Sequence, residues 1–350
     1  MMREAIAQVV ARQDLDEAQM RSVMEAIMSG QATDAQIGSF ITALRMKGET
    51  IDEITGAARV MRDKATFVDT GIDTTHGLLM DIVGTGGDGS GTFNVSTTTA
   101  FVVAGAGVPV AKHGNRAVSS ACGSADVLEA LGVDLTLSPT QVADCVRGVG
   151  IGFLFAPMLH EAMRHAIGPR RELGIRTIFN ILGPLTNPAR TNVQLTGVFA
   201  QELTVPIAQV LARLGMRRAL VVWGEGNMDE LTITGTSHIA DAHDGQVEAY
   251  TIEPEDVGLA RARLEDIRGG ATPAASAALV REVLTNTPGA RLDMVLLNAG
   301  AALLAAGKAH DLRGGIELAQ ETIASGAALA RLEGLVALSL IHISEPTRPY

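Results

Sequence analysis

A glycine-rich loop between two short apolar runs carries the residue types that bind phosphate. Residues 84–91 read Gly-Thr-Gly-Gly-Asp-Gly-Ser-Gly and follow a predicted strand over 78–83. Glycines at these positions allow backbone N–H groups to converge on one anion. Lys112 ends the next predicted strand, over 108–112, and would bring its ammonium beside the loop. This spacing predicts a phosphate-binding site at the carboxyl ends of two neighbouring strands.

Polar side chains directly after the loop extend this site. Asn94, Ser96, Thr97 and Thr98 open the next predicted helix. Serine and threonine at a helix N-terminus are ordinarily caps. Four polar side chains together, with the positive end of the helix dipole, also suit a diphosphate.

The loop also satisfies the G-x-G-x-x-G pattern of dinucleotide-binding folds. In that fold the second strand ends in an acidic residue that binds the ribose, whereas this one ends in Lys112-His113. Asp88 would face a pyrophosphate unless a cation lay between them, and Mg²⁺ bridges carboxylate and diphosphate oxygens. A P-loop lysine does not follow the loop, which makes ATPase chemistry a poor fit. We therefore favour a metal-bridged diphosphate, with a glycine turn that binds nothing as the alternative.

An acidic pair near residue 230 supplies candidate metal ligands. Asp229 and Glu230 follow a predicted strand over 219–223 and a short loop. The carboxyl ends of strands are where open α/β sheets bind ligands, and hard oxygen ligands suit Mg²⁺. On this pattern alone, a solvated acidic turn explains the pair equally well.

Composition limits the classes of partner. Among 350 residues, 28 Lys and Arg against 39 Asp and Glu give a net charge of −11, which disfavours binding to nucleic acid or an anionic membrane. Basic residues gather between positions 112 and 176 instead, a pattern that suits a small anionic ligand: Lys112, Arg116, Arg164, Arg170, Arg171 and Arg176. Two cysteines are too few for a disulfide framework. With no apolar export segment or membrane span in view, we expect a cytoplasmic protein.

The N-terminal part, residues 1–72, is predicted to be a small α-helical domain. Asp16, Thr33 and Thr50 each stand three residues before Gln or Glu, as in a capping box, and mark three helix starts. A unit this short cannot bury all of its apolar surface. We therefore expect it to pack on the other domain or to form a homodimer surface.

Residues 73–338 are predicted to form a larger α/β domain with a mostly parallel central sheet. Short apolar runs alternate with helical stretches, and Asp244-Gly245 marks a hairpin. Predicted strands cover 78–83, 108–112, 151–156, 193–199 and 219–223, and predicted helices cover 158–174, 205–214, 274–284, 292–307 and 316–338. A segment near 165–190 is expected to return to the helical domain. Residues 339–350 break the helical period and resemble a translated vector or adapter tail, so we set them aside; a disordered native tail is the alternative.

Several long motifs, in order along the chain, resemble anthranilate phosphoribosyltransferases. They are residues 81–89 (Asp-Ile-Val-Gly-Thr-Gly-Gly-Asp-Gly), 94–97 (Asn-Val-Ser-Thr), 111–116 (Ala-Lys-His-Gly-Asn-Arg), 123–126 (Gly-Ser-Ala-Asp) and 180–188 (Asn-Ile-Leu-Gly-Pro-Leu-Thr-Asn-Pro). Residues 43–50 resemble the helical domain of the same family. The resemblance implies transfer of phosphoribose from 5-phosphoribosyl 1-diphosphate to the amine of anthranilate, in tryptophan biosynthesis.

The resemblance also implies roles for individual residues. The donor site would comprise Gly84, Gly87, Asp88, Thr92, Asn94, Val95, Ser96, Thr97, Lys112, His113, Gly114, Asn115, Arg116, Ala117, Val118, Ser119, Ser120 and Ser124. Anthranilate would meet Gly84, Asn115 and Arg170. Magnesium, expected as two ions, would be held by Ser96, Asp229 and Glu230. His113 and His160 would have auxiliary roles, with orienting a loop favoured over proton transfer.

Two rival functions share this architecture. A pyrimidine nucleoside phosphorylase would bind inorganic phosphate and a nucleoside, but it has no diphosphate for the Asp229-Glu230 pair to neutralise through a metal. A non-catalytic relative that binds nucleic acid would need surface cations, against which the net charge of −11 argues.

Overall fold

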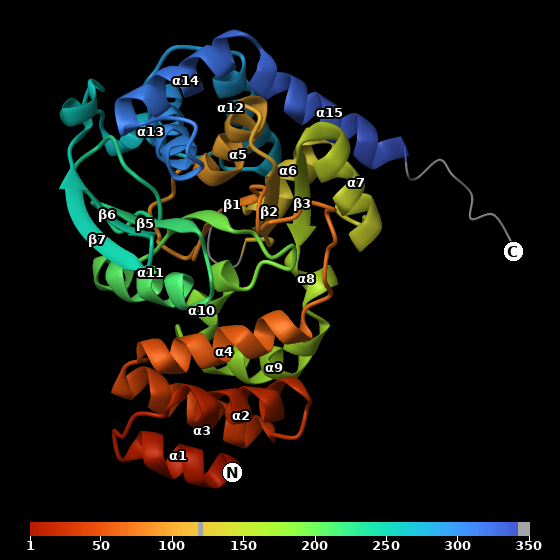
Figure 1. Ribbon diagram of the computed structural model, residues 1–350, viewed down its shortest axis with the longest axis vertical. Coiled ribbons are helices and arrows are strands. Elements are labelled where there is room, and N and C mark those ends of the chain that lie inside the picture. The colour runs from red at the N-terminus through yellow and green to blue at the C-terminus, as the bar shows by residue number, and fades with distance from the viewer. Residues whose placement is uncertain (118–121, 342–350) are drawn as a thin grey trace, which may run out of the picture.

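The computed structural model describes residues 1–117 and 122–341. Four helices stack at the N-terminal end of the molecule (Figure 1): α1 (Met2–Val10), α2 (Glu17–Met28), α3 (Asp34–Lys47) and α4 (Ile51–Lys64). The predicted capping boxes are confirmed at Asp16, Thr33 and Thr50, where each side chain accepts a hydrogen bond from the amide three residues on. Helix α1 has no side-chain cap, so no capping motif marks its start.

A buried ion pair joins the helices of this domain. Glu53, on α4, is fully buried and accepts hydrogen bonds from the N–H groups of Leu15 at 2.9 Å and Thr50 at 2.8 Å. Its charged partner is Lys47, whose Nζ lies 3.0 Å from Glu53 Oε2. A buried carboxylate is tolerated when it is paired and hydrogen-bonded in this way, and it fixes the start of α4 against the connection before α2.

A seven-stranded sheet forms the centre of the second domain, in the order β3-β2-β1-β4-β5-β6-β7. Its first five strands are parallel: β1 (Met80–Gly84), β2 (Val110–Gly114), β3 (Ile151–Phe155), β4 (Val193–Gly197) and β5 (Arg218–Gly224). The antiparallel pair β6 (Ser237–His243) and β7 (Gln246–Ile252) confirms the predicted hairpin. Strand order reverses between β1 and β4, and the crevice at such a switch point is where open α/β sheets bind ligands.

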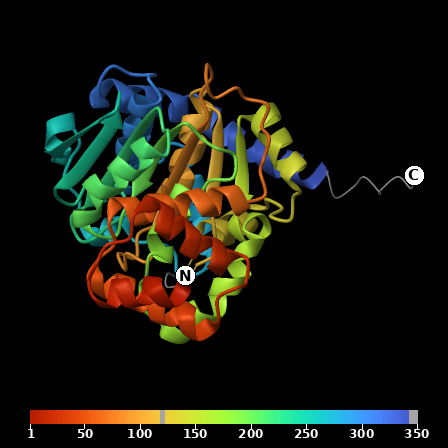
Figure 2. The same cartoon turned by 60° about the horizontal axis from the view of Figure 1, so that its bottom comes forward.

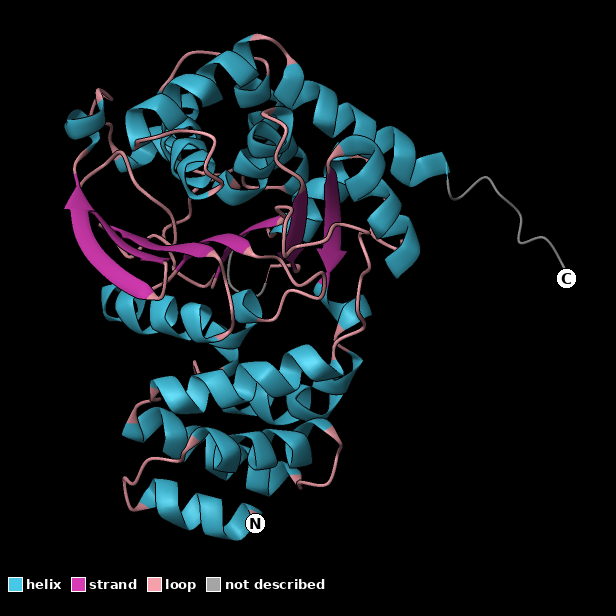
Figure 3. Ribbon diagram, viewed as in Figure 1, coloured by secondary structure: helices cyan, strands magenta, loops and turns pink. Residues whose placement is uncertain are grey.

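Helices cover both faces of the sheet (Figure 3). One face packs with α5 (Val95–Gly105), α6 (Ser124–Leu131), α7 (Pro139–Val149), α12 (Pro273–Leu284), α13 (Ala290–Ala305), α14 (Leu312–Ala324) and α15 (Ala327–Ile341). The other face packs with α11 (Thr204–Arg213) and α10 (Phe179–Leu182), in a core that continues into the helical domain. On β5, Leu220 and Val222 belong to the first core and Ala219 and Val221 to the second, as expected for a strand buried on both faces.

Short turns complete the chain between these elements. The helix α8 (Ala156–Leu159) follows β3, and α9 (Arg164–Leu173) lies against α2 and α3 (Figure 2). Five 3₁₀ turns lie at Glu161–Met163, Gln201–Leu203, Gly183–Leu185, Pro254–Val257 and Leu264–Ile267.

Three predictions about helices are wrong. The helix expected over 158–174 is broken at His160, whose φ of −121° and ψ of 57° are not helical. The helix expected over 316–338 is broken between α14 and α15 at Gly326, where φ is 78°. The helical period was expected to end at Ser339, but α15 continues to Ile341, and the Ser339 hydroxyl accepts a hydrogen bond from the Asp134 amide at 3.1 Å. The remainder of the expected tail, 342–350, lies outside the described residues.

Within residues 1–117 and 122–341, no single helix is long and apolar enough to cross a membrane. The α14 and α15 helices reach that length and apolar character only when taken together, and the pair is bent by 60°.

Candidate active site

The glycine loop leaves the end of β1 and passes directly over Asp229. The Gly86 amide donates a hydrogen bond to Asp229 Oδ2 at 2.7 Å. A Cβ at Gly84 would collide with the same carboxylate, so the strand can end there only in glycine. Gly86 and Gly87 have φ of 66° and 67°, which side chains other than glycine rarely adopt. Glycine therefore serves two purposes here: at Gly84 it allows close approach to Asp229, and at Gly86 and Gly87 it allows the backbone conformation.

The far end of the loop is fixed by hydroxyl and backbone contacts. The Ser90 hydroxyl donates to Asp88 and lies 3.1 Å from Thr92 Oγ1. Thr92 forms an antiparallel bridge with Arg268, and the Gly91 carbonyl accepts from the Gly269 amide at 2.9 Å. The loop is thereby closed onto the segment that precedes α12.

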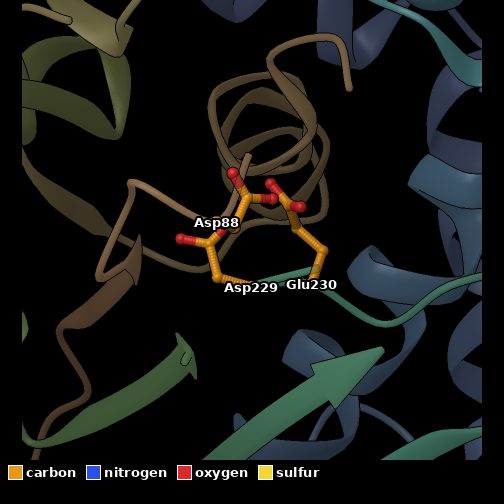
Figure 4. A group of neighbouring side chains, drawn as sticks. All are labelled: Asp88, Asp229 and Glu230. Atoms are coloured by element: carbon orange, nitrogen blue, oxygen red, sulfur yellow. The ribbon is translucent and has the colours of Figure 1, made fainter. Parts of the chain in front are cut away.

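Three carboxylates meet beside the loop (Figure 4). Asp88, Asp229 and Glu230 each offer an oxygen within 4.8 Å of the others. Burial raises the pKa of Asp229 to about 6, and repulsion from Asp88 adds to the shift. Burial and the neighbouring Asp229 charge raise the pKa of Glu230 as well. Such a cluster is costly to ionise without a cation.

The cluster fits a hard divalent cation. Glu230 Oε2 is buried and has no hydrogen-bond partner among the described residues. Carboxylate oxygens are the ligands that Mg²⁺ prefers, usually one or two of them together with substrate phosphates. The unpartnered oxygen and the three converging carboxylates together satisfy this requirement, so the residues present fit a magnesium site.

Lys112 lies in the middle of β2, which continues to Gly114, and not at the end of the strand as predicted. Its Nζ donates to the Ile82 carbonyl at 2.6 Å and to Ser96 Oγ at 3.3 Å. Burial lowers its pKa to about 8, while the charges of Asp81, Glu230 and Asp229 oppose this shift. The position of Lys112 beside the glycine loop stays a prediction, and the contacts of its ammonium in the structure are with β1 and with Ser96 at the start of α5.

Asp81 is the buried counter-charge under Lys112. Its Oδ1 accepts from the His113 amide at 3.0 Å and its Oδ2 from Asn187 Nδ2 at 2.7 Å. Asn187 Nδ2 also donates to the Ala111 carbonyl at 2.7 Å. Burial raises the pKa of Asp81 to about 6 despite these donors. The network fixes the last residues of β2 and, with them, the start of the loop that follows.

The two candidate auxiliary histidines contact each other. His113 Nε2 and His160 Nε2 are 3.2 Å apart, and both side chains are buried. Burial lowers the pKa of His113 to about 3 and that of His160 to about 4. Both rings are therefore neutral near pH 7, and in this arrangement they join β2 to the turn that follows α8.

The N-terminus of α5 supplies a mixture of half-buried and buried groups. Asn94 stands at the N-cap without a side-chain cap bond, and its Nδ2 donates to the Cys122 carbonyl at 3.2 Å. The side chains of Val95 and Thr97 are buried. Thr98 donates its hydroxyl to the Asn94 carbonyl at 2.8 Å, so its side chain serves the helix backbone. The Ser96 hydroxyl accepts a hydrogen bond from the Lys112 ammonium and so lies beside a charged group.

The loop after β2 is held by Asp126. Asp126 Oδ2 accepts from the amides of Ala117 and Gly123, each at 2.9 Å, on either side of the undescribed residues. The guanidinium of Arg116 pairs with Asp126 at 3.0 Å and with Glu129 at 2.8 Å. Gly114 and Asn115 continue from β2, and the Asn115 carbonyl accepts from the Ser124 hydroxyl at 3.2 Å. Val118, Ser119 and Ser120 lie outside the described residues.

The basic segment after His160 presents two arginines on aromatic rings. The Arg170 guanidinium, on α9, lies 5.1 Å from the centre of the Phe179 ring. Burial lowers the pKa of Arg170. Arg176 lies 4.2 Å from the centre of the Phe199 ring and donates to the Gly87 carbonyl.

Sequence reasoning found most of this arrangement but missed four roles. It expected Mg²⁺ to lie between Asp88 and the diphosphate, but it did not count Asp88 with Asp229 and Glu230 among the metal ligands, where the structure places its carboxylate. Asp81 and Asn187 stood in recognised motifs, but nothing in the pattern showed that they bond each other. The contact of Arg176 with the loop spans 89 positions and has no local signal.

This chain is similar to known proteins in sequence and in structure. The glycosyl transferase family, a/b domain, matches residues 76–329, and the helical bundle domain of that family matches residues 3–65. Anthranilate phosphoribosyltransferase of Desulfotalea psychrophila is 69% identical over 336 residues, 96% of each chain. The crystal structure of the Thermus thermophilus enzyme superposes with a TM-score of 0.90 at 46% identity, covering 96% of this chain and 99% of that one.

A Saccharomyces cerevisiae enzyme of the same name, in complex with PRPP (5-phosphoribosyl 1-diphosphate) and Mg, superposes with a TM-score of 0.86 at 28% identity. It is matched over 97% of this chain and 98% of the yeast chain. Because the family models match both domains and these relatives are matched over nearly their whole length, this chain belongs to the anthranilate phosphoribosyltransferase family.

Proposed function

We propose that this protein transfers the 5-phosphoribosyl group from 5-phosphoribosyl 1-diphosphate to the amine of anthranilate, releasing diphosphate, as a step of tryptophan biosynthesis. The observation that carries the proposal is the meeting of the glycine loop with Asp229 and Glu230 at the switch point of the sheet. A loop that presents amides to an anion, directly beside carboxylates that suit a cation, is the arrangement that a metal-bound diphosphate requires.

The donor would bind along the glycine loop and the N-terminus of α5. Backbone amides of the loop and the positive end of the helix dipole face the diphosphate, and Lys112 adds a positive charge from β2. The Asp81 and Asn187 network holds the start of the following loop, residues 113–117, which would close the phosphoribosyl site.

Magnesium would be held by Asp229 and Glu230, with Asp88 as the third carboxylate and Ser96 as a hydroxyl ligand beside Lys112. We propose two ions, since three carboxylates around a diphosphate exceed the one or two that a single Mg²⁺ usually takes. Bound there, the metal supplies positive charge that neutralises the diphosphate.

Anthranilate would bind on the α9 side of the same crevice. Arg170 pairs with its carboxylate in this proposal, because a planar guanidinium binds a carboxylate through two parallel hydrogen bonds. The Phe179 ring supports the guanidinium from behind, at 5.1 Å. Asn115 and Gly84 would complete the acceptor site between Arg170 and the donor.

The reaction asks more for alignment and charge stabilisation than for a strong base. The bond from the anomeric carbon to diphosphate breaks while the amine nitrogen forms its bond to that carbon, and negative charge develops on the leaving oxygen. Lys112 is placed to stabilise that charge. The nitrogen loses its extra proton easily after attack, so His113 and His160 serve in this proposal to hold the site in shape rather than to take a proton.

Product analysis tests the assignment. Incubation with anthranilate, 5-phosphoribosyl 1-diphosphate and Mg²⁺ is expected to yield N-(5-phosphoribosyl)anthranilate and one equivalent of diphosphate by mass spectrometry and a diphosphate assay. Formation of ribose 1-phosphate from a pyrimidine nucleoside and inorganic phosphate, without the first reaction, would replace the proposal with the phosphorylase alternative.

We also propose a homodimer formed through the helical domain and a cytoplasmic location. Val10 at the end of α1 and Met46 on α3 are exposed apolar side chains in that domain, 65% and 69% accessible. Light scattering coupled to size-exclusion chromatography is expected to give twice the 36.5 kDa chain mass, whereas a monomeric mass would overturn the dimer.

A further inference from the structure

Arg176 connects the segment after α9 to the glycine loop. Its Nη2 donates a hydrogen bond to the Gly87 carbonyl, and its guanidinium lies 4.2 Å from the centre of the Phe199 ring. The hydrogen bond and the cation–π contact together restrict the position of the guanidinium.

Phe199 is itself fixed to the beginning of the loop. Its amide donates to Thr85 Oγ1 at 3.0 Å, and the Thr85 amide donates to the Gly197 carbonyl at 3.0 Å. Arg176 therefore binds Gly87 while it lies on a residue that is bonded to Thr85. The contacts of Arg176 and Phe199 therefore hold two residues of the loop, Gly87 and Thr85.

The glycine loop needs such restraint from outside its own sequence. Gly86, Gly87, Gly89 and Gly91 all have positive φ, and glycine has the largest conformational entropy to lose when it is ordered. Asp229 holds the Gly86 amide and Arg176 the Gly87 carbonyl, so consecutive groups of the loop are fixed from two different parts of the chain. Fixing the Gly87 carbonyl also fixes the direction of the next amide, that of Asp88, because the peptide unit is planar.

The segment that supplies Arg176 also supplies Arg170. Gly174, with φ of 60°, ends α9 between the two arginines, and each arginine lies on a phenylalanine ring. Thus one short segment reaches toward the acceptor through Arg170 and toward the donor loop through Arg176.

We propose that Arg176 is a positioning residue that holds the glycine loop in its diphosphate-binding conformation. This inference rests on the proposed function for the identity of the donor. It predicts that loss of the arginine weakens donor binding selectively, since the side chain touches the donor loop and not the acceptor residue Arg170.

Kinetics of Arg176→Ala, Arg176→Lys and a control, Arg171→Ala, test the proposal. Arg171 is exposed in the same segment, so its loss controls for removal of one positive charge. Removing one hydrogen bond from a charged donor is expected to raise the KM for 5-phosphoribosyl 1-diphosphate about tenfold in Arg176→Ala, with the KM for anthranilate changed less than about twofold. Lysine keeps the charge but loses the planar stacking, and is expected to restore part of the affinity.

Calorimetric titration of each variant with 5-phosphoribosyl 1-diphosphate and Mg²⁺, without acceptor, separates this inference from the proposed function. If the wild-type chain binds the donor and Arg176→Ala binds it about tenfold more weakly, the positioning role stands even where anthranilate is not the acceptor. Equal donor affinity of Arg176→Ala and Arg171→Ala would overturn it. Should the alanine variant lose its wild-type melting temperature, the Arg176→Lys comparison decides in its place, and a donor affinity equal to wild type would then contradict the proposal.

Discussion

The amide of Gly86 donates a hydrogen bond to Oδ2 of Asp229, joining groups 143 positions apart at 2.7 Å. Gly86 follows β1 and Asp229 follows β5, and β4 lies between these strands in the sheet. The phosphate loop and the acidic turn are therefore one structure. A change in either is expected to disturb both anion binding and cation binding.

Gly84→Ala is expected to abolish activity because its Cβ would displace the Asp229 carboxylate. Forcing the extra methyl group into this contact is expected to cost about 1–3 kcal/mol in the free energy of unfolding. Gly38→Ala is the matched control, since a Cβ at Gly38 meets nothing within 4 Å. Steady-state rates and melting temperatures of both variants check the prediction, and full activity of Gly84→Ala would show that the carboxylate has freedom to move.

Glu230→Gln is expected to lower kcat at least about 100-fold, because one charged ligand of the proposed metal is lost. In the metal-free protein the same substitution is expected to raise the melting temperature near pH 8. The reason is that it removes a buried carboxylate that burial and Asp229 make costly to ionise. Glu202→Gln, at an exposed position, is the control. A metal-free Glu230→Gln protein that melts below wild type would argue that this carboxylate is satisfied without a cation.

The buried histidines predict an acid-sensitive fold. The folded-state pKa of His160, about 4, lies below the usual 6.5, so between these values the unfolded chain binds the proton that the folded chain refuses. Stability is unaffected above about pH 6.5 and falls as the pH drops below it, by about 2 kcal/mol between pH 6.5 and pH 5 from this group.

The variant His160→Gln keeps a donor toward His113 and removes the titration, so its urea-unfolding free energy is expected to fall less over this pH range. His76→Gln, at an exposed position, should lose stability as steeply as wild type. Equal pH dependence of His160→Gln and wild type would contradict the assignment of a neutral His160.

Arg170→Ala is expected to raise the KM for anthranilate about 10- to 100-fold, the loss of one charged pair, with a smaller effect on the KM for the donor. Arg171→Ala again serves as the control. An increase confined to the donor KM would misplace the acceptor site.

Local signals explain why so much of the fold was predictable. The capping boxes at Asp16, Thr33 and Thr50 are formed within four residues, and the sequence alone states them. The parallel strands are buried on both faces and read as short apolar runs, so their positions were predicted within one or two residues. The break at His160 was missed because it depends on that residue's tertiary contact with His113, not on the pattern around it.

The site was predictable where chemistry was concentrated in one stretch. Glycines, Lys112 and the acidic pair were visible as residue types, and the parallel sheet predicted from alternating helices and strands places the carboxyl ends of its strands at one edge. The bonds of Asp81 to Asn187 and of Arg176 to Gly87 join segments whose relative position is set only by the packed sheet and helices. The pattern of residue types along the chain does not indicate such contacts.

The most direct measurement of the central claim is the loss of anthranilate fluorescence in the presence of 5-phosphoribosyl 1-diphosphate, with and without Mg²⁺. The account predicts a decay that requires the protein, the donor and the metal together, and that chelation of Mg²⁺ stops. Unchanged fluorescence with folded protein at saturating substrates and Mg²⁺ would contradict it.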